Sequence, residues 1–305
     1  MANHHIDIPQ LNFIKMIKKI KHFFKSIFDH KYQNIELLGR IHLNSLLSLD
    51  RALVKKVNME FNGYSQGGED GVILFLCHVY NCETAIEIGT ENWEQSNLRL
   101  ATRLFHLSTG LIDGDMKNMK YVNNDKISYL EHIKTLASWV NKDNINTLID
   151  DLKHKMNIDD VDIISLDIDG VDYHVMDNIN SKPKIFIVEY NSIFGDHLKS
   201  TVPYSESFYR YNYHYSGTIY GSSYQLWIDL FHKKGYELFF TTSTGNNMFF
   251  VRKDIFDKVN NFNCELKLFS NMSYRESLDQ NKKRLKESSF EIKKYLNEVK
   301  IENYE

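Results

Sequence analysis

Polar side chains gather at the ends of two apolar runs near the middle of the chain. The run VDIISLDIDGVDYHV contains Asp167, Asp169 and Asp172, and the run KIFIVEYNS ends in Glu189 and Asn191. Crowded carboxylates of this kind need cations or hydroxyl groups as partners. About twenty residues separate the two runs, which matches one helical crossover between neighbouring parallel strands. The two polar strand ends should therefore face each other across a cleft.

A second group of polar residues follows two earlier predicted strands. The segment EIGTEN places Glu87 near the C-terminal end of one predicted strand, where its carboxylate can accept hydrogen bonds from an ammonium group. Gly89 comes directly after that strand, where the missing side chain lets a ligand approach the backbone. The next strand ends in LIDGD, and Asp113 follows Gly89 by about 24 residues, close to the spacing at which a carboxylate binds an adenosine ribose. Asp115 is the reserve candidate for this contact.

The residues after the first strand favour one class of nucleoside cofactor. A dinucleotide is expected to bring the fingerprint GxGxxG, which receives its pyrophosphate at a helix N-terminus. Here the segment EIGTENWEQS has one glycine, and Glu91 and Glu94 would repel a pyrophosphate. A cofactor with an amino-acid tail and a sulfonium suits these residues, so the segment favours S-adenosylmethionine over NAD. In the alternative, Gly89 and Asp113 are ordinary residues at strand ends.

Alternating apolar segments predict the sheet that positions these residues. Strands are expected at TAIEIG, GLID, KISYLEHI, DIISLD and KIFIVE, with helices between them, as in a parallel α/β sheet. YELFFTT and MFFVR, joined by the turn STGNN, predict a closing antiparallel hairpin. We expect an N-terminal helical extension over residues 1–60, a catalytic domain over 61–254, and a C-terminal helical extension over 255–305. The charged stretch 282–300 is predicted to form one solvated or interfacial helix.

The order of these fragments resembles the FkbM-related S-adenosylmethionine-dependent methyltransferases. The matching fragments are YSQGGEDG, EIGTENWEQSN, GLIDGD, SLDIDGVDYHV, FIVEYNSIFG, TVPY and GNNMFFVRKD. The resemblance implies the Rossmann-like class I methyltransferase fold, an α/β fold with a seven-stranded, mostly parallel sheet. The segment Thr90-Glu91-Asn92 departs from the family, many of whose members have a second glycine here. In this family the cofactor lies over the first strand, which assigns to it Glu87, Gly89 and Asp113, with Ser65, Gln66 and Glu69 closing over its methionine end.

Methyl transfer to a hydroxyl requires removal of the hydroxyl proton beside the methyl carbon. A divalent cation such as Mg²⁺ would lower the pKa of a hydroxyl that it binds. Asp167, Glu189 and Asn191 supply the oxygen ligands that hard cations prefer, with Asp169 as a fourth. The arrangement resembles the metal site of magnesium-dependent catechol and macrolide-sugar O-methyltransferases.

The alternative to a metal site is a general base. Asp167 and Asp169 would then cap the following helix and bind substrate hydroxyls. The base would be Asp169, His174 or His197. His174 lies at a helical position, where histidines often serve packing, whereas the pKa range of His197 suits a base near neutrality. His197 follows FGD in the loop beyond Glu189, where it can reach a substrate.

The acceptor is expected to be a small molecule or glycan intermediate rich in hydroxyl groups. The loop TVPYSESFYRYNYHYSGTIYGSS carries many tyrosines, and aromatic faces with polar tips suit sugar rings. Tyr204, Tyr211 and Tyr220 are the predicted contacts. We expect O-methylation of a sugar or of a sugar-, nucleotide- or phosphoryl-linked intermediate. The rivals are a metal-dependent glycosyltransferase that uses Asp167-Ile168-Asp169 as a DxD motif and a peripheral scaffold with a vestigial cofactor fold.

Composition narrows the class of partner. The chain has 305 residues, 42% of them hydrophobic, and a net charge of -3, which argues against nucleic acid as a partner. Three cysteines without a CxxC pair, and the lack of an apolar run long enough to span a bilayer, predict a cytoplasmic protein. Residues 11–28 form a basic amphipathic pattern. That pattern predicts either peripheral contact with the inner membrane surface or packing against the protein body or a second subunit, as in a homo-oligomer.

Overall fold

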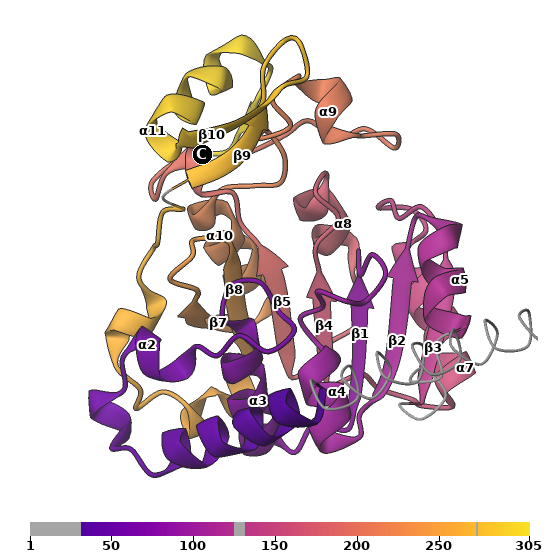
Figure 1. Ribbon diagram of the computed structural model, residues 1–305, viewed down its shortest axis with the longest axis vertical. Coiled ribbons are helices and arrows are strands. Elements are labelled where there is room, and N and C mark those ends of the chain that lie inside the picture. Colours follow the sequence, from indigo (N-terminus) through magenta and orange to yellow (C-terminus); the bar gives the residue numbers. More distant parts are fainter. Residues whose placement is uncertain (1–31, 125–131, 273) are drawn as a thin grey trace, which may run out of the picture.

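The computed structural model describes residues 32–124, 132–272 and 274–305, which surround a seven-stranded sheet (Figure 1). The strand order is β3-β2-β1-β4-β5-β8-β7, in which β1 to β5 are parallel to their neighbours and β8 is antiparallel to both β5 and β7. This is the arrangement of the class I methyltransferase fold, so the expected fold is confirmed. The strands are β1 (Thr84–Ile88), β2 (Ser108–Asp113), β3 (Ile133–Ala137), β4 (Ile163–Leu166), β5 (Ile185–Glu189), β7 (Tyr236–Thr241) and β8 (Asn247–Arg252).

The central strands are apolar on both faces because helices cover both faces. In β1, Ile86 and Ile88 face one core cluster, and Ala85 faces the other. Helices α7 (Ile145–Met156), α8 (Asp172–Asn178) and α10 (Tyr224–Lys234) contribute to the first cluster, and α3 (Glu69–Tyr80) and α4 (Arg99–Phe105) to the second. Helix α5 (Met116–Asn124) packs against β2 and β3. Helices packed on both faces hold the central strands in place, and with them the polar residues at the strand ends.

The N-terminal part of the described chain packs against α4. Residues 32–47 are helical, and Glu36 on this helix pairs with Arg103. This helix ends at residue 47, and the short elements η1 (Arg51–Leu53) and α2 (Lys56–Met59) follow it. The amphipathic residues 11–28 and most of the segment KISYLEHI lie outside the described residues. No described helix combines the length and apolarity needed to cross a membrane.

The C-terminal segment differs from its prediction. Strands β9 (Tyr274–Leu278) and β10 (Arg284–Ser288) form an antiparallel hairpin, followed by α11 (Ser289–Ile292) and η5 (Lys293–Glu298). The prediction of one helix over 282–300 is wrong, because β10 satisfies its backbone groups by pairing with β9. Strand β11 (Glu302–Asn303) then pairs with β6 (Ser200–Thr201).

This C-terminal module, residues 274–305, lies beyond the C-terminal ends of the strands, beside the short helix α9 (Arg210–Tyr213), in Figure 1. It therefore stands over the sheet edge at which the candidate site residues were predicted.

Candidate functional site

Two cavities lie at the C-terminal edge of the sheet, and Gly89 lines both of them. Their volumes are about 240 Å³ and about 270 Å³. Each is smaller than the roughly 300–1,000 Å³ of typical small-molecule sites. We call the first the nucleoside cavity, after the nucleoside cofactor that the sequence predicts there, and the second the acidic cavity, after the carboxylates that line it.

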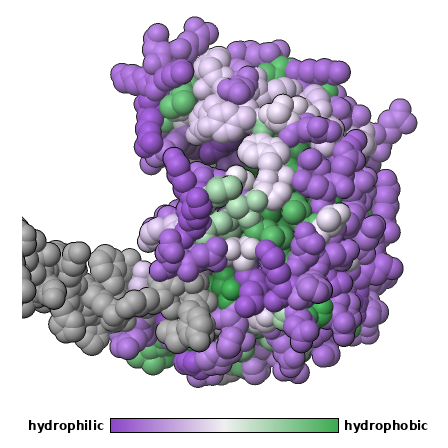
Figure 2. All heavy atoms as spheres, turned by 90° about the vertical axis from the view of Figure 1, so that its right-hand side faces the viewer, coloured by the Kyte–Doolittle hydropathy of each residue, from purple (hydrophilic) through white to green (hydrophobic). Residues whose placement is uncertain are grey.

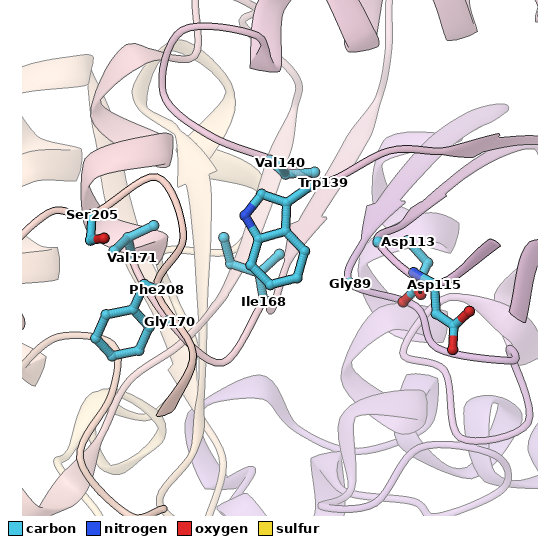
Figure 3. Close-up of a pocket in the computed structure, with 11 residues that line it drawn as sticks. Gly89, Asp113, Asp115, Trp139, Val140, Ile168, Gly170, Val171, Ser205 and Phe208 are labelled. Atoms are coloured by element: carbon cyan, nitrogen blue, oxygen red, sulfur yellow. Dashed lines mark hydrogen bonds between the residues drawn. The ribbon is translucent and has the colours of Figure 1, made fainter. Parts of the chain in front are cut away.

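The nucleoside cavity is a mainly apolar slot between the segments that follow β2, β3 and β4. Its walls include Trp139, Ile168 and Phe208, and the carboxylates of Asp113 and Asp115 lie on one side of the Trp139 indole (Figure 3). The indole nitrogen of Trp139 donates a hydrogen bond to the Glu206 carbonyl at 2.7 Å, which fixes the ring. Figure 2 shows the molecule hollowed between the sheet and the C-terminal module, with less polar side chains in the hollow.

Asp113 is held firmly at the end of β2. One of its carboxylate oxygens accepts from the Glu91 amide at 2.8 Å, and the other accepts from the Asp115 amide at 2.8 Å and the Asn118 side chain at 3.1 Å. Asp115 accepts from the Lys117 amide at 2.7 Å in the turn that begins α5. Both predicted ribose carboxylates therefore line the same cavity in fixed positions. Sequence reasoning missed Trp139, whose only signal was an aromatic residue just beyond a strand.

Three of the four other residues predicted to contact the cofactor line the acidic cavity. Glu87 is buried and accepts from Ser96 and from the Asn97 amide at 2.9 Å, and burial raises its pKa to about 7. Glu69 accepts from the Gly67 amide and from the Asn247 side chain, both at 2.6 Å. Gln66 also lines this cavity.

Ser65 does not line either cavity. Its hydroxyl donates to Asp70 at 2.9 Å, and the Asp70 amide donates back to that hydroxyl at 3.1 Å. Ser65 therefore fixes the turn before α3, and its predicted contact with a cofactor is not seen in the cavity lining. Sequence reasoning also missed Asn97, Asn246, Asn247 and Met272, which line the acidic cavity.

Asp167, Asp169 and Glu189 form an acidic cluster at the ends of β4 and β5. Each offers one carboxylate oxygen, and these oxygens all lie within 4.8 Å of one another. Asp172 is not part of the cluster, because its two oxygens accept from the Ile168 and Gly170 amides at 2.8 Å each. Those bonds hold the loop in which Asp169 adopts a left-handed conformation, with φ of 53°. Asp172 thus positions the cluster.

The structure does not bring Asn191 into this cluster. Its amide nitrogen donates to the Thr218 and Tyr220 carbonyls at 2.9 and 3.0 Å, and its oxygen accepts from the Ile193 amide. All its polar atoms thus bind backbone groups, and the cluster contains Asp169, predicted as a possible fourth ligand, in its place.

The charges of the cluster are partly balanced by groups from outside the sheet. Arg210 pairs with Asp169 at 2.6 Å, and the Tyr220 hydroxyl donates to Glu189 at 3.0 Å. Burial, followed by the Asp169 charge, raises the pKa of Glu189 to about 8. Burial and the Glu189 charge hold the pKa of Asp167 well above its usual range. Three converging carboxylates with raised pKa values are a donor set that fits a hard divalent cation.

The predicted histidine bases lie elsewhere. The His197 side chain is 93% exposed beside Asp196 and lines neither cavity. His174 contacts the Val202 carbonyl at 3.0 Å and is likewise absent from both cavities.

Of the three predicted tyrosine contacts, only Tyr220 lines one of the two cavities. Tyr204 packs against His174, with ring centroids 5.5 Å apart. Tyr211 is 40% exposed and lies beneath the Arg210 guanidinium. The tyrosine-rich loop therefore contributes Tyr220 to the acidic cavity, and Tyr204 and Tyr211 pack outside it.

No protein-family model matches the sequence, and no curated protein sequence shows significant similarity to it. The FkbM-related resemblance therefore rests on the short motifs alone.

Comparison with solved structures finds methyltransferases. An O-methyltransferase family protein from Burkholderia thailandensis is 9% identical, with a TM-score of 0.37, over 72% of this chain and 70% of that one. The N-terminal domain of EvdMO1 with SAH bound is 11% identical, with a TM-score of 0.38, over 70% of this chain and 93% of that one. Human N-acetylserotonin methyltransferase in complex with SAM is 10% identical, with a TM-score of 0.35, over 59% of this chain and 50% of that one. Such distant likenesses carry no information on the cofactor or substrate of this chain.

The contact between Gly89 and the end of β4 can be tested by adding one methyl group. A Cβ atom at Gly89 would lie 1.6 Å from the Asp167 carbonyl oxygen, and the backbone there has φ of +87°. Gly195 has a similar φ of +79° but nothing within 4 Å of an added Cβ. We expect Gly195→Ala to cost about 1 kcal/mol and Gly89→Ala several times more, measured by urea unfolding. Equal losses would show that the close contact does not exist.

Proposed function

We propose that this protein is an S-adenosylmethionine-dependent O-methyltransferase. The observation that carries the proposal is the junction of the two cavities at Gly89. An apolar slot with two ribose-binding carboxylates lies on one side of this glycine, and buried carboxylates lie on the other. A nucleoside joined to a cationic amino acid matches both sides.

The nucleoside cavity supports adenosine as one half of the cofactor. The exposed face of Trp139 and the side chains of Ile168 and Phe208 offer a flat apolar surface for a purine. Asp113 and Asp115 can accept hydrogen bonds from ribose hydroxyls. No cationic side chain among the described residues lines this cavity, which disfavours the pyrophosphate of a dinucleotide.

The carboxylates of Glu69 and Glu87 in the acidic cavity support binding of the methionine half of the cofactor. Glu69 and Glu87 come from two different elements, α3 and β1, and both face this cavity. Carboxylates in a site of low solvent access attract the ammonium and the sulfonium more strongly than they would in water. The positively charged cofactor therefore lies with its methyl group near Gly89.

The acidic cluster supports a hydroxyl as methyl acceptor. The pKa of Glu189 is raised to about 8, so its ionised fraction, which grows as the pH rises toward 8, can take up the hydroxyl proton. Asp167 and Asp169 can orient the same hydroxyl or its neighbour by accepting hydrogen bonds. A divalent cation held by Asp167, Asp169 and Glu189 would lower the pKa of the acceptor hydroxyl. A polyhydroxylated acceptor such as a sugar suits a cavity whose walls are mainly polar.

Calorimetric titration with S-adenosylmethionine and S-adenosylhomocysteine tests the cofactor. We expect both to bind the unmodified protein, and Asp113→Asn to weaken binding about tenfold because one ribose acceptor is lost. Asp150→Asn, on the exposed face of α7, is the matched control and should bind normally. NAD and UDP-glucose should not displace S-adenosylhomocysteine. Failure of both S-adenosyl compounds to bind would overturn the proposal, and displacement by UDP-glucose would favour a glycosyltransferase.

Titration with MnCl₂, followed by electron paramagnetic resonance, tests the cation site without any acceptor. We expect one Mn²⁺ per chain, and at least about tenfold weaker binding in Asp167→Asn, because one anionic ligand becomes neutral. Asp177→Asn, at an exposed position on α8, should bind Mn²⁺ like the unmodified protein. If the unmodified protein binds no Mn²⁺, the cluster acts through its carboxylates alone.

A further inference from the structure

We propose that residues 205–210, which we call the gate segment, form a gate over both cavities, and that the cofactor enters and leaves when this gate opens. The inference rests on the proposed function, because it describes how the proposed cofactor reaches its site. Ser205 and Phe208 line the nucleoside cavity, and Arg210 lines the acidic cavity. One short segment therefore contributes to the walls of both cavities.

The nucleoside cavity is closed around the position expected for the ribose. Asp113, the predicted ribose contact, lines this cavity but is only 8% exposed. Phe208 of the gate segment is also 8% exposed, and Figure 3 shows it on the other side of the Trp139 indole from Asp113. A ligand bound to Asp113 would be enclosed, so part of the wall has to move before the ligand can enter.

The gate segment is loosely packed between two anchored ends. Phe208 is the only buried residue within 205–210. Before the segment, β6 pairs with β11 of the C-terminal module. After it, the Tyr213 hydroxyl donates to the Lys300 carbonyl of the same module. A segment with few buried side chains can open locally while its flanks stay in place, so the wall that moves is the gate segment.

Two contacts close the gate segment over the nucleoside cavity. The Trp139 indole nitrogen donates to the Glu206 carbonyl at 2.7 Å, which joins the segment after β3 to the gate segment. Phe208 packs directly on the backbone of Gly170, where an added Cβ atom would lie 3.0 Å from the Phe208 ring. Trp139 is 52% exposed, so water can replace the Glu206 carbonyl as its partner. This closing contact can therefore break and form again.

A third closing contact lies in the acidic cavity. The Arg210 Nη1 atom is 2.6 Å from Asp169, and the two side chains are 26% and 45% exposed. Ion pairs with this degree of exposure are weak. Arg210 follows Phe208 by two residues, so release of Arg210 from Asp169 also loosens the wall of the nucleoside cavity. A change at the acidic cluster is therefore coupled to exchange of the cofactor.

Surface plasmon resonance on the full chain, with S-adenosylhomocysteine as the analyte, tests the gate. We expect Trp139→Phe to raise the association and dissociation rate constants about fivefold, because one closing hydrogen bond is lost in the free and the bound protein. Arg210→Gln should raise both about threefold, although this residue lines the other cavity. Tyr209→Phe, at an exposed position of the gate segment, is the first control. Arg252→Gln is the second, because Arg252 pairs with Asp254 at the opposite edge of the sheet, and both controls should keep the unmodified rates.

The association rate constant distinguishes a gate from a fixed wall. A fixed wall that only contacts the bound ligand affects the dissociation rate constant alone. Unchanged association in both Trp139→Phe and Arg210→Gln would therefore overturn the inference. Arg210→Lys keeps a positive charge for Asp169 and should return the rates toward those of the unmodified protein. Rates in Arg210→Lys as high as those in Arg210→Gln would show that the ion pair does not close the gate.

Hydrogen exchange of the ligand-free protein tests the gate without any cofactor. We expect the amides of the gate segment to exchange about threefold faster in Arg210→Gln than in the unmodified protein. The amides of β5 should exchange equally in both proteins, which shows that the variant is folded. Equal exchange of the gate segment in both proteins would overturn the inference. Failure of S-adenosylhomocysteine to bind would count against the proposed function, and hydrogen exchange would still decide whether the gate opens.

Discussion

The candidate site depends on the close approach of the end of β1 to the end of β4. Gly89 has no side chain, and even a single methyl group there would overlap the Asp167 carbonyl. The Gly89 amide donates to the Ile112 carbonyl of β2 at 2.8 Å, and the Asp167 amide donates to the Ile88 carbonyl of β1 at 2.9 Å. These bonds place three strand ends side by side. The nucleoside cavity and the acidic cluster are therefore neighbours.

The second constraint is electrostatic. Burial, and then the repulsion among three carboxylates whose oxygens lie within 4.8 Å of one another, disfavour ionisation and raise the pKa values of Asp167 and Glu189. Arg210 balances Asp169, and the hydroxyl of Tyr220, which Arg275 supports, binds Glu189. Arg210, Tyr220 and Arg275 come from the loop after β5 and from the C-terminal module, so these outer segments complete the site.

Some of this arrangement was predictable from the sequence for a simple geometric reason. Parallel strands joined by helices bring their C-terminal ends to one edge, so Glu87, Asp113, Asp167 and Glu189 had to lie near each other once the strands were recognised. Spacing also places Asn191 at this edge, but an amide can bind the backbone as well as a ligand, and Asn191 is bound to backbone groups.

Other parts depend on tertiary contacts that have no local signal. Residues 282–300 are rich in charged residues with helical spacing, but pairing with β9 makes Arg284–Ser288 a strand. The contact of Arg275 with Tyr220 follows from where the C-terminal module folds, far along the chain from Glu189, whereas Trp139 lies just beyond β3 and is brought beside Asp113 by the fold. The same holds for His197, whose loop carries it into solvent instead of toward the cluster.

A crystal structure of the protein with S-adenosylhomocysteine would test the proposed site most directly. We predict one continuous ligand that passes Gly89, with the purine beside Trp139, the ribose on Asp113 and the amino-acid end near Glu69 and Glu87. A ligand bound away from Gly89, or confined to one of the two cavities, would show that the two cavities do not form one cofactor site.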